Sequence, residues 1–271
     1  MNGQTFAKLQ TLIHEQVGIR LDDRQEMVTS RLRRVARAAG FDDVDDYITR
    51  VLANPSPERL SEVVDRLSTN HTFFHREAKH FEQLADVLQP LVAQRRQQGV
   101  RDIRLWCAAA SFGQEPYQLA MILREVIGPE VSKWKAGLLA TDISSDALAT
   151  AKAGIYEEED VAKLPPARQR WFLKTKDGKR KVRPELQRDV TYRRLNLVTG
   201  PFSFRVPFDI IFCRNVMIYF DLDVRTRLVH HLAQVLQPGG HLFISLSETL
   251  PQDRSLPFTY VSPGLYRRNA Y

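Results

Sequence analysis

The sequence contains little cysteine and no long apolar run. Its 271 residues include two cysteines, Cys107 and Cys213, which are too few for a disulfide framework. Both lie at the ends of apolar, strand-like runs, so we expect them to be buried free thiols. No apolar stretch approaches the roughly 18 residues of a membrane span, and the N-terminal MNGQTFAKLQ lacks the apolar core of a secretory signal. These absences predict a cytoplasmic protein that does not insert into a membrane.

The glycine-rich turns that hold a pyrophosphate are also missing. The chain contains neither G-x-G-x-x-G nor G-x-x-x-x-G-K-[ST], in which backbone N–H groups cradle phosphates. The sequence therefore argues against NAD or ATP as the ligand. The chain does carry a net charge of +7, from 39 Lys and Arg against 32 Asp and Glu. This excess favours an acidic partner without choosing between nucleic acid, anionic lipid and protein.

The first 84 residues read as short helices followed by a linker, with no strand pattern. Apolar residues recur at helical spacing over 5–17, and further helices are expected over 45–53 and 57–68. In the helix that follows GIRLDD, the apolar side chains fall on one arc at about 100° per residue, and a group of arginines lies outside this arc. These are Arg31, Arg33, Arg34 and Arg37. The basic face that they form is either a solvated surface or a contact for an acidic partner.

From residue 101 onward, strands alternate with helices. This order predicts parallel strands with helices on both faces, which is a doubly wound α/β sheet, and we assign it to a domain over 85–271. The expected strands and helices cover 103–109, 115–127, 136–141, 145–153, 191–195, 209–214, 224–236 and 241–246, with a last extended segment over 258–267. The polar, turn-rich KTKDGKRKVRP lies within 171–195, which we expect to form a small antiparallel β insert.

A run of small residues separates the first expected strand from its helix. In LWCAAASFGQEPYQLAM (105–121), side-chain bulk is lost over CAAAS, and a glycine follows before the helix begins. Ligands of open α/β sheets bind outside the carboxyl ends of the strands, and small side chains there let a flat ligand touch the main chain. Because the phosphate-binding turns are missing, a nucleoside without phosphates fits best.

Two acids lie where such a ligand would bind. Asp142 ends the second expected strand, where it can accept hydrogen bonds from both hydroxyls of a ribose or, alternatively, cap the next helix. Glu115 lies in the first turn of the helix over 115–127, where it either stabilises the helix dipole or contacts the ligand. The residues themselves leave both pairs of alternatives open.

Three sequence blocks together resemble one protein family. They are LSTNHTFFHRE at 67–77, WCAAASFGQEPYQLAM at 106–121 and FDIIFCRNVMIYFD at 208–221, supported by ATDIS at 140–144, LNL at 195–197 and LSE at 246–248. This series is similar to that of the bacterial chemotaxis receptor methyltransferases, the CheR family, over nearly the whole chain. The resemblance implies a Rossmann-like S-adenosylmethionine methyltransferase sheet with an all-helical N-terminal domain. It also implies methyl transfer from S-adenosylmethionine to receptor glutamates, with S-adenosylhomocysteine as the product.

The resemblance, carried over residue by residue, implies a cofactor site and two residues beside the methyl group. The implied cofactor contacts are Asn70, Thr72, Arg76, Glu115, Asp142, Asn196, Leu197, Arg214 and Asn215. Arg76 and Tyr219 would flank the transferred methyl group. Without the resemblance, Asn70 and Thr72 could instead cap a helix that starts near Phe73, and Tyr219 could be a core aromatic residue with a satisfied hydroxyl.

One helix start departs from the family's pattern. Family members often read S-T-G-E-E-P-Y-S where this chain has S-F-G-Q-E-P-Y-Q, so Phe112, Gln114 and Gln118 differ. The second acid of that pattern is retained as Glu115. Gln114 removes a negative charge near a cationic ligand, and we expect this change to weaken the affinity for the sulfonium form of the cofactor.

The resemblance also implies a partner for the basic face. The methylation regions of chemoreceptors are long helical bundles rich in glutamate, so we expect such a bundle to bind Arg31, Arg33, Arg34 and Arg37. A methyltransferase acting on an exocyclic amine of a nucleic-acid base would end its fourth strand in something like [DN]-P-P-[FYW]. This chain has C-R-N-V there and no visible aromatic platform for a flipped base, so we expect no nucleic-acid partner.

Three histidines occur close together in HTFFHREAKH. His71 and His75 have the spacing of a zinc-binding helix and His80 follows, but H-E-x-x-H is absent and no cysteine is near. Methyl transfer from a sulfonium needs no metal, so no metal is expected. A catalytically inactive module that only binds cofactor or receptor stays open as an alternative, and an assay of methyl transfer distinguishes it from an enzyme.

Overall fold

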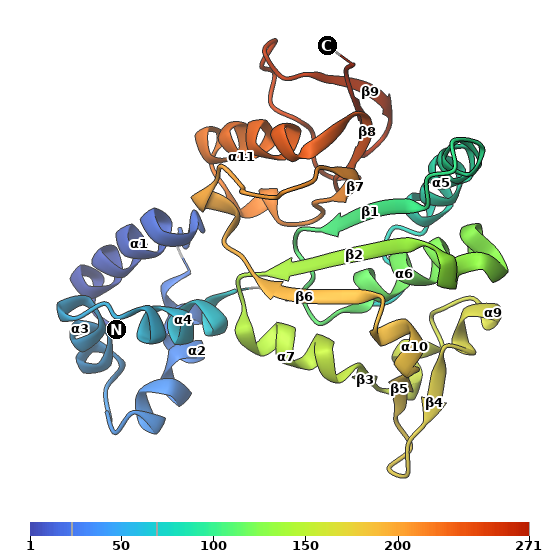
Figure 1. The fold of residues 1–271 in the computed structure, drawn as a ribbon. Coiled ribbons are helices and arrows are strands. Elements are labelled where there is room, and N and C mark those ends of the chain that lie inside the picture. Colours follow the sequence, from blue (N-terminus) through green and yellow to red (C-terminus); the bar gives the residue numbers. More distant parts are fainter. Residues whose placement is uncertain (23, 69, 271) are drawn as a thin grey trace.

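The chain consists of a helical part at the N-terminus and an α/β part built around a large sheet (Figure 1). The computed structural model describes residues 1–22, 24–68 and 70–270. The helical part contains α1 (Gly3–Val17), α2 (Gln25–Ala38), α3 (Val44–Ala53) and α4 (Pro57–Leu67). Their apolar faces meet in one core, to which these helices contribute Leu9, Leu32, Ile48 and Val63. The helices predicted for this part of the sequence are confirmed.

Local signals in the sequence set the ends of these helices. Asn2 Oδ1 accepts a hydrogen bond from Thr5 N (2.9 Å) at the start of α1, and Ser56 begins α4 as its cap. Gly18 ends α1 with a left-handed φ of 69°, which a residue without a Cβ adopts at little cost.

A long helix that was not predicted from the sequence follows the linker. α5 (Lys79–Gln97) carries Phe81, Leu84 and Leu88 at helical spacing, and these side chains are buried in the core of the α/β part. α5 packs against α6 (Gln114–Ile127). The boundary expected after residue 84 therefore falls inside a helix whose apolar residues belong to the α/β part.

Within the described residues, the large sheet has seven strands in the order β6-β2-β1-β7-β8-β10-β9. In chain order they are β1 (Asp102–Cys107), β2 (Lys135–Asp142), β6 (Val190–Arg194), β7 (Phe208–Phe212), β8 (Leu236–Phe243), β9 (Phe258–Ser262) and β10 (Leu265–Arg268). Strands β6, β2, β1, β7 and β8 are parallel, while β10 and β9 extend the sheet as an antiparallel hairpin. The predicted sheet is confirmed, and its last extended segment is a hairpin.

Alternate side chains of the strands face opposite cores, so both faces of the sheet are covered. Leu105 and Cys107 of β1 join a core shared with α5, α6 and α7 (Ser145–Ala153). Trp106 joins the opposite core, which includes α11 (Leu222–Val235). Since β2 lies on one side of β1 and β7 on the other, the strand order reverses at β1. Ligands of doubly wound sheets bind outside the carboxyl ends of the strands at this point.

A small antiparallel sheet extends away from the large one (Figure 1). Its strands are β3 (Ile155–Tyr156), β5 (Arg180–Val182) and β4 (Phe172–Lys174), in that order. The predicted insert over 171–195 is therefore wrong at both ends. Its third strand is β3, which precedes the predicted range. The end of that range, from Val190, is β6, which pairs with β2. Val190 and Tyr192 of β6 are buried in the core of the large sheet.

Short helices connect the main elements. They are η1 (Gly128–Lys133), α8 (Glu158–Val161), α9 (Pro166–Gln169), α10 (Pro184–Gln187), η2 (Leu197–Thr199) and η3 (Met217–Tyr219). η2 follows β6 and η3 follows β7, so both lie at the carboxyl edge of the sheet. Across the part of the chain that the structure describes, every helix is too short or too polar to cross a membrane.

The end of α1 and the loop after it hold the helical part against the carboxyl edge of the sheet. Arg20 N donates a hydrogen bond to Tyr219 O (3.2 Å), and Asn196 Nδ2 donates to Gln16 O (2.7 Å). These contacts join the helical part to the segments that follow β7 and β6. The helical part therefore forms a wall beside the strand ends.

Gly18 lies at this contact and allows a stability prediction. A Cβ at Gly18 would lie 2.7 Å from Val198 Cγ1, whereas a Cβ at Gly40, which also has a positive φ, meets nothing within 4 Å. We predict that Gly18→Ala lowers the free energy of unfolding by about 1–3 kcal/mol more than Gly40→Ala, because only Gly18→Ala overpacks the contact. Urea denaturation measures both variants. Equal losses would show that Val198 moves aside without cost.

Candidate active site

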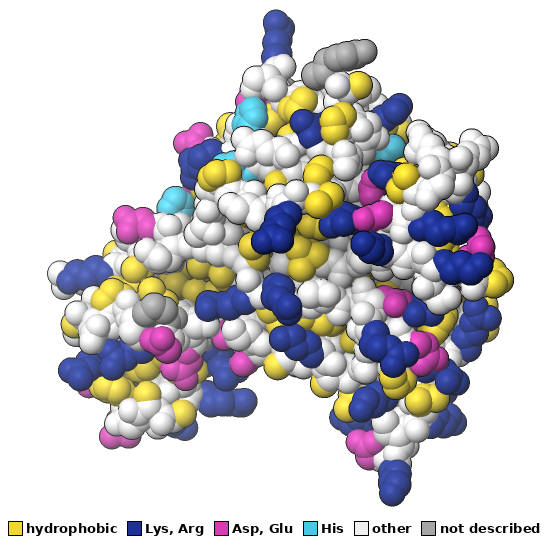
Figure 2. Space-filling model, in the orientation of Figure 1, with side chains coloured by type: hydrophobic (Ala, Val, Ile, Leu, Met, Phe, Trp, Pro, Cys, Tyr) yellow, Lys and Arg dark blue, Asp and Glu magenta, His cyan; other side chains and the backbone are white. Residues whose placement is uncertain are grey.

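A cleft opens at the carboxyl ends of the strands, between the large sheet and the helical part. It is lined by Ala108, Ala109 and Ser111 after β1 and by Val17 and Met27 from the helical part. It contains about 1140 Å³ of empty space, counted out to its open mouth. Figure 2 shows Lys and Arg side chains spread over both parts of the molecule, so the positive charge is not confined to the surroundings of the cleft.

The residues that the resemblance assigns to a cofactor and to the methyl group all line this cleft. They are Asn70, Thr72, Arg76, Glu115, Asp142, Asn196, Leu197, Arg214, Asn215 and Tyr219. They come from the linker after α4, the first turn of α6, and the segments that end or follow β2, β6 and β7. The fold thus brings distant segments of the sequence to one edge of the sheet, and their contacts with a ligand stay predictions.

Asp142 holds the turn that follows β1. It is 8% exposed, and its carboxylate accepts hydrogen bonds from Ser111 N (2.8 Å) and Ser144 N (2.9 Å). Burial raises the pKa of this carboxyl group, and the backbone donors oppose that rise. The cap of α7 is Ser144, whose Oγ accepts from Ala147 N (3.1 Å), so Asp142 does not cap this helix. Each Asp142 oxygen accepts one of these bonds and keeps acceptor capacity for a ligand.

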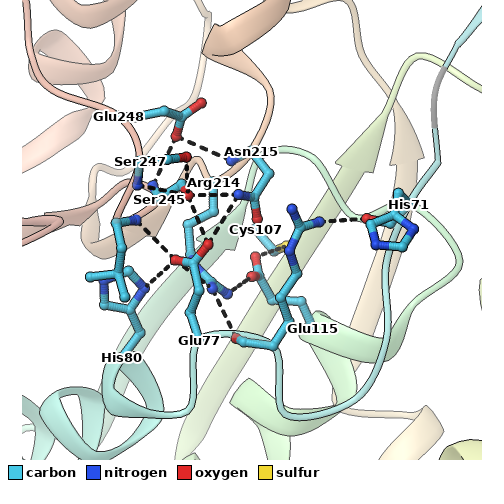
Figure 3. Close-up of polar contacts among 12 residues, drawn as sticks. His71, Glu77, His80, Cys107, Glu115, Arg214, Asn215, Ser245, Ser247 and Glu248 are labelled. Carbon is cyan, nitrogen blue, oxygen red and sulfur yellow. Dashed lines mark hydrogen bonds and ion pairs between the residues drawn. The ribbon is translucent and has the colours of Figure 1, made fainter.

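A buried arginine links the segments around the cleft (Figure 3). The Arg214 side chain is 1% exposed and forms ion pairs with Glu77 (Nη2–Oε2 3.0 Å) and with Glu115. Its Nη2 also donates to Arg76 O (2.9 Å), and Glu115 Oε1 accepts from Cys107 Sγ (3.2 Å). Burial would lower the pKa of Arg214, but the charges of Glu115 and Glu77 outweigh it and raise this pKa. The guanidinium is buried because these two carboxylates compensate its charge.

Glu77 is a residue of this site that was not predicted from the sequence. Its Oε1 accepts from Asn215 Nδ2 (3.1 Å) and Ser245 Oγ (2.7 Å), and its Oε2 accepts from Leu246 N (3.0 Å). Burial would raise the pKa of Glu77, but the Arg214 charge and these donors lower it to about 2. Glu77 is the last residue of LSTNHTFFHRE, so the motif contained it. No spacing rule, however, relates it to the loops after β7 and β8.

Glu248 is a second acid whose role was not predicted, although it ends the LSE block. Its Oε2 accepts from Asn215 N (3.1 Å) and Ser245 N (2.8 Å), and its Oε1 accepts from Ile218 N (3.2 Å). Burial raises the pKa of Glu248, and these backbone donors oppose the rise. Asn215 and Ile218 belong to the turn after β7 that ends in Tyr219. Glu248 therefore fixes the backbone that leads to the Tyr219 side chain.

The linker after α4 supplies Asn70 and Thr72 to the cleft. Asn70 Oδ1 accepts from Ser111 Oγ (3.3 Å), which connects the linker to the turn after β1. The next helix, α5, begins at Lys79. Neither Asn70 nor Thr72 therefore caps a helix near Phe73, and that alternative interpretation is wrong.

Arg76 and Tyr219 are both half-buried in the lining of the cleft. Arg76 Nη1 donates to His71 O, and its guanidinium carbon lies 5.9 Å from the centre of the Phe73 ring. Tyr219 packs at the edge of the core that includes α11 and is not enclosed by it. Both side chains can thus meet a ligand in the cleft.

Asn196 and Leu197 lie where β6 leads into η2. Asn196 Oδ1 accepts from Val198 N (3.2 Å) and so caps η2, while its Nδ2 donates to Gln16 O at the end of α1 (2.7 Å). Leu197 is 7% exposed and belongs to the core that includes α11. Asn196 therefore attaches the helical part to the sheet in addition to lining the cleft.

The basic face of α2 is smaller than predicted. Arg33, Arg34 and Arg37 are exposed, whereas Arg31 is half-buried and its Nη1 donates to Leu67 O (3.2 Å). Leu67 is the last residue of α4, where carbonyl groups lack partners within the helix and the dipole attracts a cation. The prediction that Arg31 belongs to an outward face is therefore wrong.

Gln114 and Gln118, which depart from the family's pattern, are buried at the start of α6. Neither belongs to the described lining of the cleft. The residue of α6 that lines the cleft is Glu115. The Gln114 side chain therefore does not touch the ligand space, and its expected effect on cofactor affinity stays a prediction. Gln118 has a structural role, since its Oε1 accepts a hydrogen bond from His75 N.

The three histidines of HTFFHREAKH have different neighbours. His71 packs against Phe73 (ring centres 5.8 Å apart), His75 stacks on Phe81 (6.2 Å), and the buried His80 packs against another aromatic ring. Within the described residues, no group of three or more His, Cys, Asp and Glu side chains is arranged to hold a metal ion.

Comparison with known proteins identifies the family that these features match. Residues 4–68 match the family described as CheR methyltransferase, all-alpha domain, and residues 70–262 match CheR methyltransferase, SAM binding domain. The chain is 34% identical over 267 residues to the chemotaxis protein methyltransferase of Borreliella burgdorferi, covering 97% of this chain and 94% of that protein. It is 38% identical over 248 residues to the chemotaxis protein methyltransferase of Escherichia coli, covering 90% and 83%. Chemotaxis protein methyltransferase 2 of Pseudomonas aeruginosa is 36% identical over 270 residues, covering 96% and 93%.

The depressed pKa of Glu77 predicts a pH-dependent contribution to stability. Because its folded pKa of about 2 lies below the ordinary 4.5, the ionised group stabilises the fold fully above that ordinary value and loses this effect as the pH falls towards 2. We expect Glu77→Gln to lower the free energy of unfolding by about 2 kcal/mol at pH 7, after allowing for solvent screening, and by about half as much at pH 3. Urea denaturation across this range tests the prediction. A difference that stays constant with pH would contradict it.

Proposed function

The chain belongs to the CheR methyltransferase family, whose larger domain binds S-adenosylmethionine, and we propose that it methylates glutamate side chains of chemoreceptors. The reaction converts a glutamate carboxylate into its methyl ester and leaves S-adenosylhomocysteine. The observation that carries this proposal is the convergence of the motif residues on one cleft. Side chains from 70–76, 108–115, 142–143 and 214–220 all line it.

The chemistry of the cleft suits S-adenosylmethionine. Ala108 and Ala109 leave room for a flat base, and Asp142 keeps acceptor capacity for the hydroxyls of a ribose.

Residues from the linker and from the later strand ends complete the proposed cofactor site. We assign to it Asn70, Thr72, Arg76, Glu115, Asn196, Leu197 and Asn215. The ion pair between Glu115 and Arg214 neutralises both charges. These two residues therefore act on the cofactor mainly by shaping the wall of the cleft.

Methyl transfer to a carboxylate needs no general base. A glutamate side chain has a pKa of about 4.3, so at pH 7 it is already ionised and nucleophilic. Bound S-adenosylmethionine supplies an electrophilic methyl group on a positively charged sulfur. The protein's task is to hold the carboxylate in line with that group, which can contribute on the order of 7 kcal/mol or more. Exclusion of water should also help, because water stabilises the separated opposite charges more than the diffuse transition state.

Arg76 and Tyr219 are proposed to hold the incoming carboxylate. An arginine carries five N–H donors, and Arg76 commits Nη1 to His71 O, which leaves donors to orient a carboxylate. A full ion pair with Arg76 would make the carboxylate a weaker nucleophile. The Tyr219 hydroxyl can donate a hydrogen bond without adding a charge, so the two residues together can orient the nucleophile while keeping it reactive.

Replacement of Tyr219 tests this assignment. We predict that Tyr219→Phe lowers kcat about 10-fold, the effect of one hydrogen bond to a charged group, and changes the Kd for S-adenosylhomocysteine less than about 2-fold. Transfer of labelled methyl groups to a cytoplasmic chemoreceptor fragment gives kcat, and calorimetry gives Kd. Tyr260→Phe, at an exposed position of β9, is the control and should change neither. An unchanged kcat in Tyr219→Phe would refute the catalytic role.

The exposed arginines of α2 suit a glutamate-rich partner. Arg33, Arg34 and Arg37 lie on the solvent side of α2, opposite the apolar residues that it buries in the helical core. We propose that this face, without Arg31, binds the glutamate-rich helical bundle of the receptor. Complementary charges of this kind increase the association rate and are screened by salt.

Charge reversal on α2 tests the receptor contact. We predict that Arg34→Glu combined with Arg37→Glu weakens binding of the receptor fragment about 10-fold or more at low salt and leaves the Kd for S-adenosylhomocysteine unchanged. Lys135→Glu with Arg254→Glu is the matched control. It changes the net charge equally at exposed positions, at the amino end of β2 and in the loop before β9. Equal receptor affinities of the two double variants would show that the basic face of α2 is a solvated surface and not a receptor contact.

A further inference from the structure

We propose that Glu77 is a positioning residue for methyl transfer, which sets Arg76 and the turn leading to Tyr219 relative to one another. This inference rests on the proposed roles of Arg76 and Tyr219. Glu77 itself does not need to touch either substrate, since its carboxylate is occupied by protein donors.

The Glu77 carboxylate joins three segments of the chain (Figure 3). It belongs to the linker, and it binds Arg214 and Asn215 after β7 and Ser245 and Leu246 after β8. Both carboxylate oxygens are used, with donor distances between 2.7 and 3.1 Å. The linker that carries Arg76 and the turn that leads to Tyr219 are therefore both attached to this carboxylate.

The backbone of Arg76 is fixed on both sides. His75 N donates to Gln118 Oε1, and Arg76 O accepts from Arg214 Nη2 (2.9 Å). His75 and Glu77 have φ angles of 67° and 56°, in the left-handed region that non-glycine residues rarely adopt. Such a conformation costs on the order of 1–3 kcal/mol for each residue and persists only where the surroundings enforce it. The Glu77 carboxylate supplies much of that enforcement.

The same carboxylate also contacts the segment that follows β7. Asn215 begins the turn that ends in Tyr219, and its Nδ2 donates to Glu77 while its backbone N donates to Glu248. Asn215 also has a positive φ of 57°. Loss of the Glu77 contact would therefore loosen the first residue of this turn and the residue next to Arg76 at once.

A glutamine cannot replace this glutamate, although it has the same shape. The hydrogen-bond partners of the carboxylate are donors, among them Leu246 N and the buried Arg214 guanidinium, and His80 Nδ1 lies 3.3 Å from its Oε2. The amide that Glu77→Gln introduces would bring an NH2 group against such donors and would leave Arg214 with one counter-charge, that of Glu115. We therefore expect this substitution to misplace the catalytic side chains without changing the volume of the site.

A mutant cycle tests the inference. Methyl transfer to a cytoplasmic chemoreceptor fragment is measured for the wild type, Glu77→Gln, Arg76→Ala, the double variant Arg76→Ala with Tyr219→Phe, and that double variant with Glu77→Gln added. We expect Glu77→Gln to lower kcat about 10- to 100-fold, as misplacement by an ångström can, with a change in the KM for S-adenosylmethionine below about 3-fold. In the background of Arg76→Ala with Tyr219→Phe, Glu77→Gln should lower kcat no more than about 2-fold further, because it acts through these two side chains.

Two further variants serve as a control and as a second test. Glu82→Gln makes the same change at an exposed position in the first turn of α5 and should keep wild-type kcat. Ser245→Ala removes one hydrogen-bond donor to Glu77 and leaves the negative charge of Glu77 in place. This variant therefore remains informative if Glu77→Gln does not fold. We expect Ser245→Ala to lower kcat about 3- to 10-fold, and this loss should also disappear in the background of Arg76→Ala with Tyr219→Phe.

The possible failures are distinguishable. If Arg76→Ala lowers kcat but Glu77→Gln and Ser245→Ala do not, the positioning role is refuted and the proposed function stands. A loss from Glu77→Gln that persists undiminished in the background of Arg76→Ala with Tyr219→Phe would also refute it, since it indicates a general structural role. If the wild type transfers no methyl group to the fragment, the proposed function itself fails.

Discussion

Burial of the Arg214 guanidinium at the carboxyl end of β7 is the constraint on which the architecture of the cleft depends. A buried cation is tolerated only with compensating charges and hydrogen bonds, and here these come from Glu77 in the linker and Glu115 in α6. The end of β7 therefore requires both of these segments beside it. Any doubly wound sheet has a crevice at its switch point. The paired arginine decides which side chains form the walls of this one.

Backbone strain collects around the same place. His75, Glu77, Ser111 and Asn215 all have positive φ. Glu77 is held through its carboxylate, and the other three through hydrogen bonds from their backbone N atoms. Asp142 accepts from Ser111 N, Glu248 accepts from Asn215 N, and Gln118 accepts from His75 N. Strained residues of this kind persist where the surrounding structure determines them strongly. The buried acids of the cleft thus act on backbone geometry first, and the cleft that we propose for the cofactor and the substrate carboxylate is preformed.

The alternation of strands and helices was sufficient to predict the doubly wound sheet, because hydrophobic periodicity is a local signal. α5 was missed although Phe81, Leu84 and Leu88 have helical spacing, since Pro90 interrupts the helical pattern. Asp142 and Glu115 could be located from the sequence because each lies at a strand end or helix start. Glu77, Glu248 and the position of Arg31 could not, because their partners lie on segments far away in the sequence that only the folded chain brings together.

The central claim is that S-adenosylmethionine lies over the carboxyl ends of β1 and β2, in the cleft that the Arg214 ion pairs shape. A crystal structure of the complex with S-adenosylhomocysteine tests it most directly. We expect the base beside Ala108 and Ala109, the ribose hydroxyls on Asp142, and the pairs of Arg214 with Glu77 and Glu115 intact. A product molecule bound away from the strand ends, or one that displaces Arg214 from both acids, would contradict it.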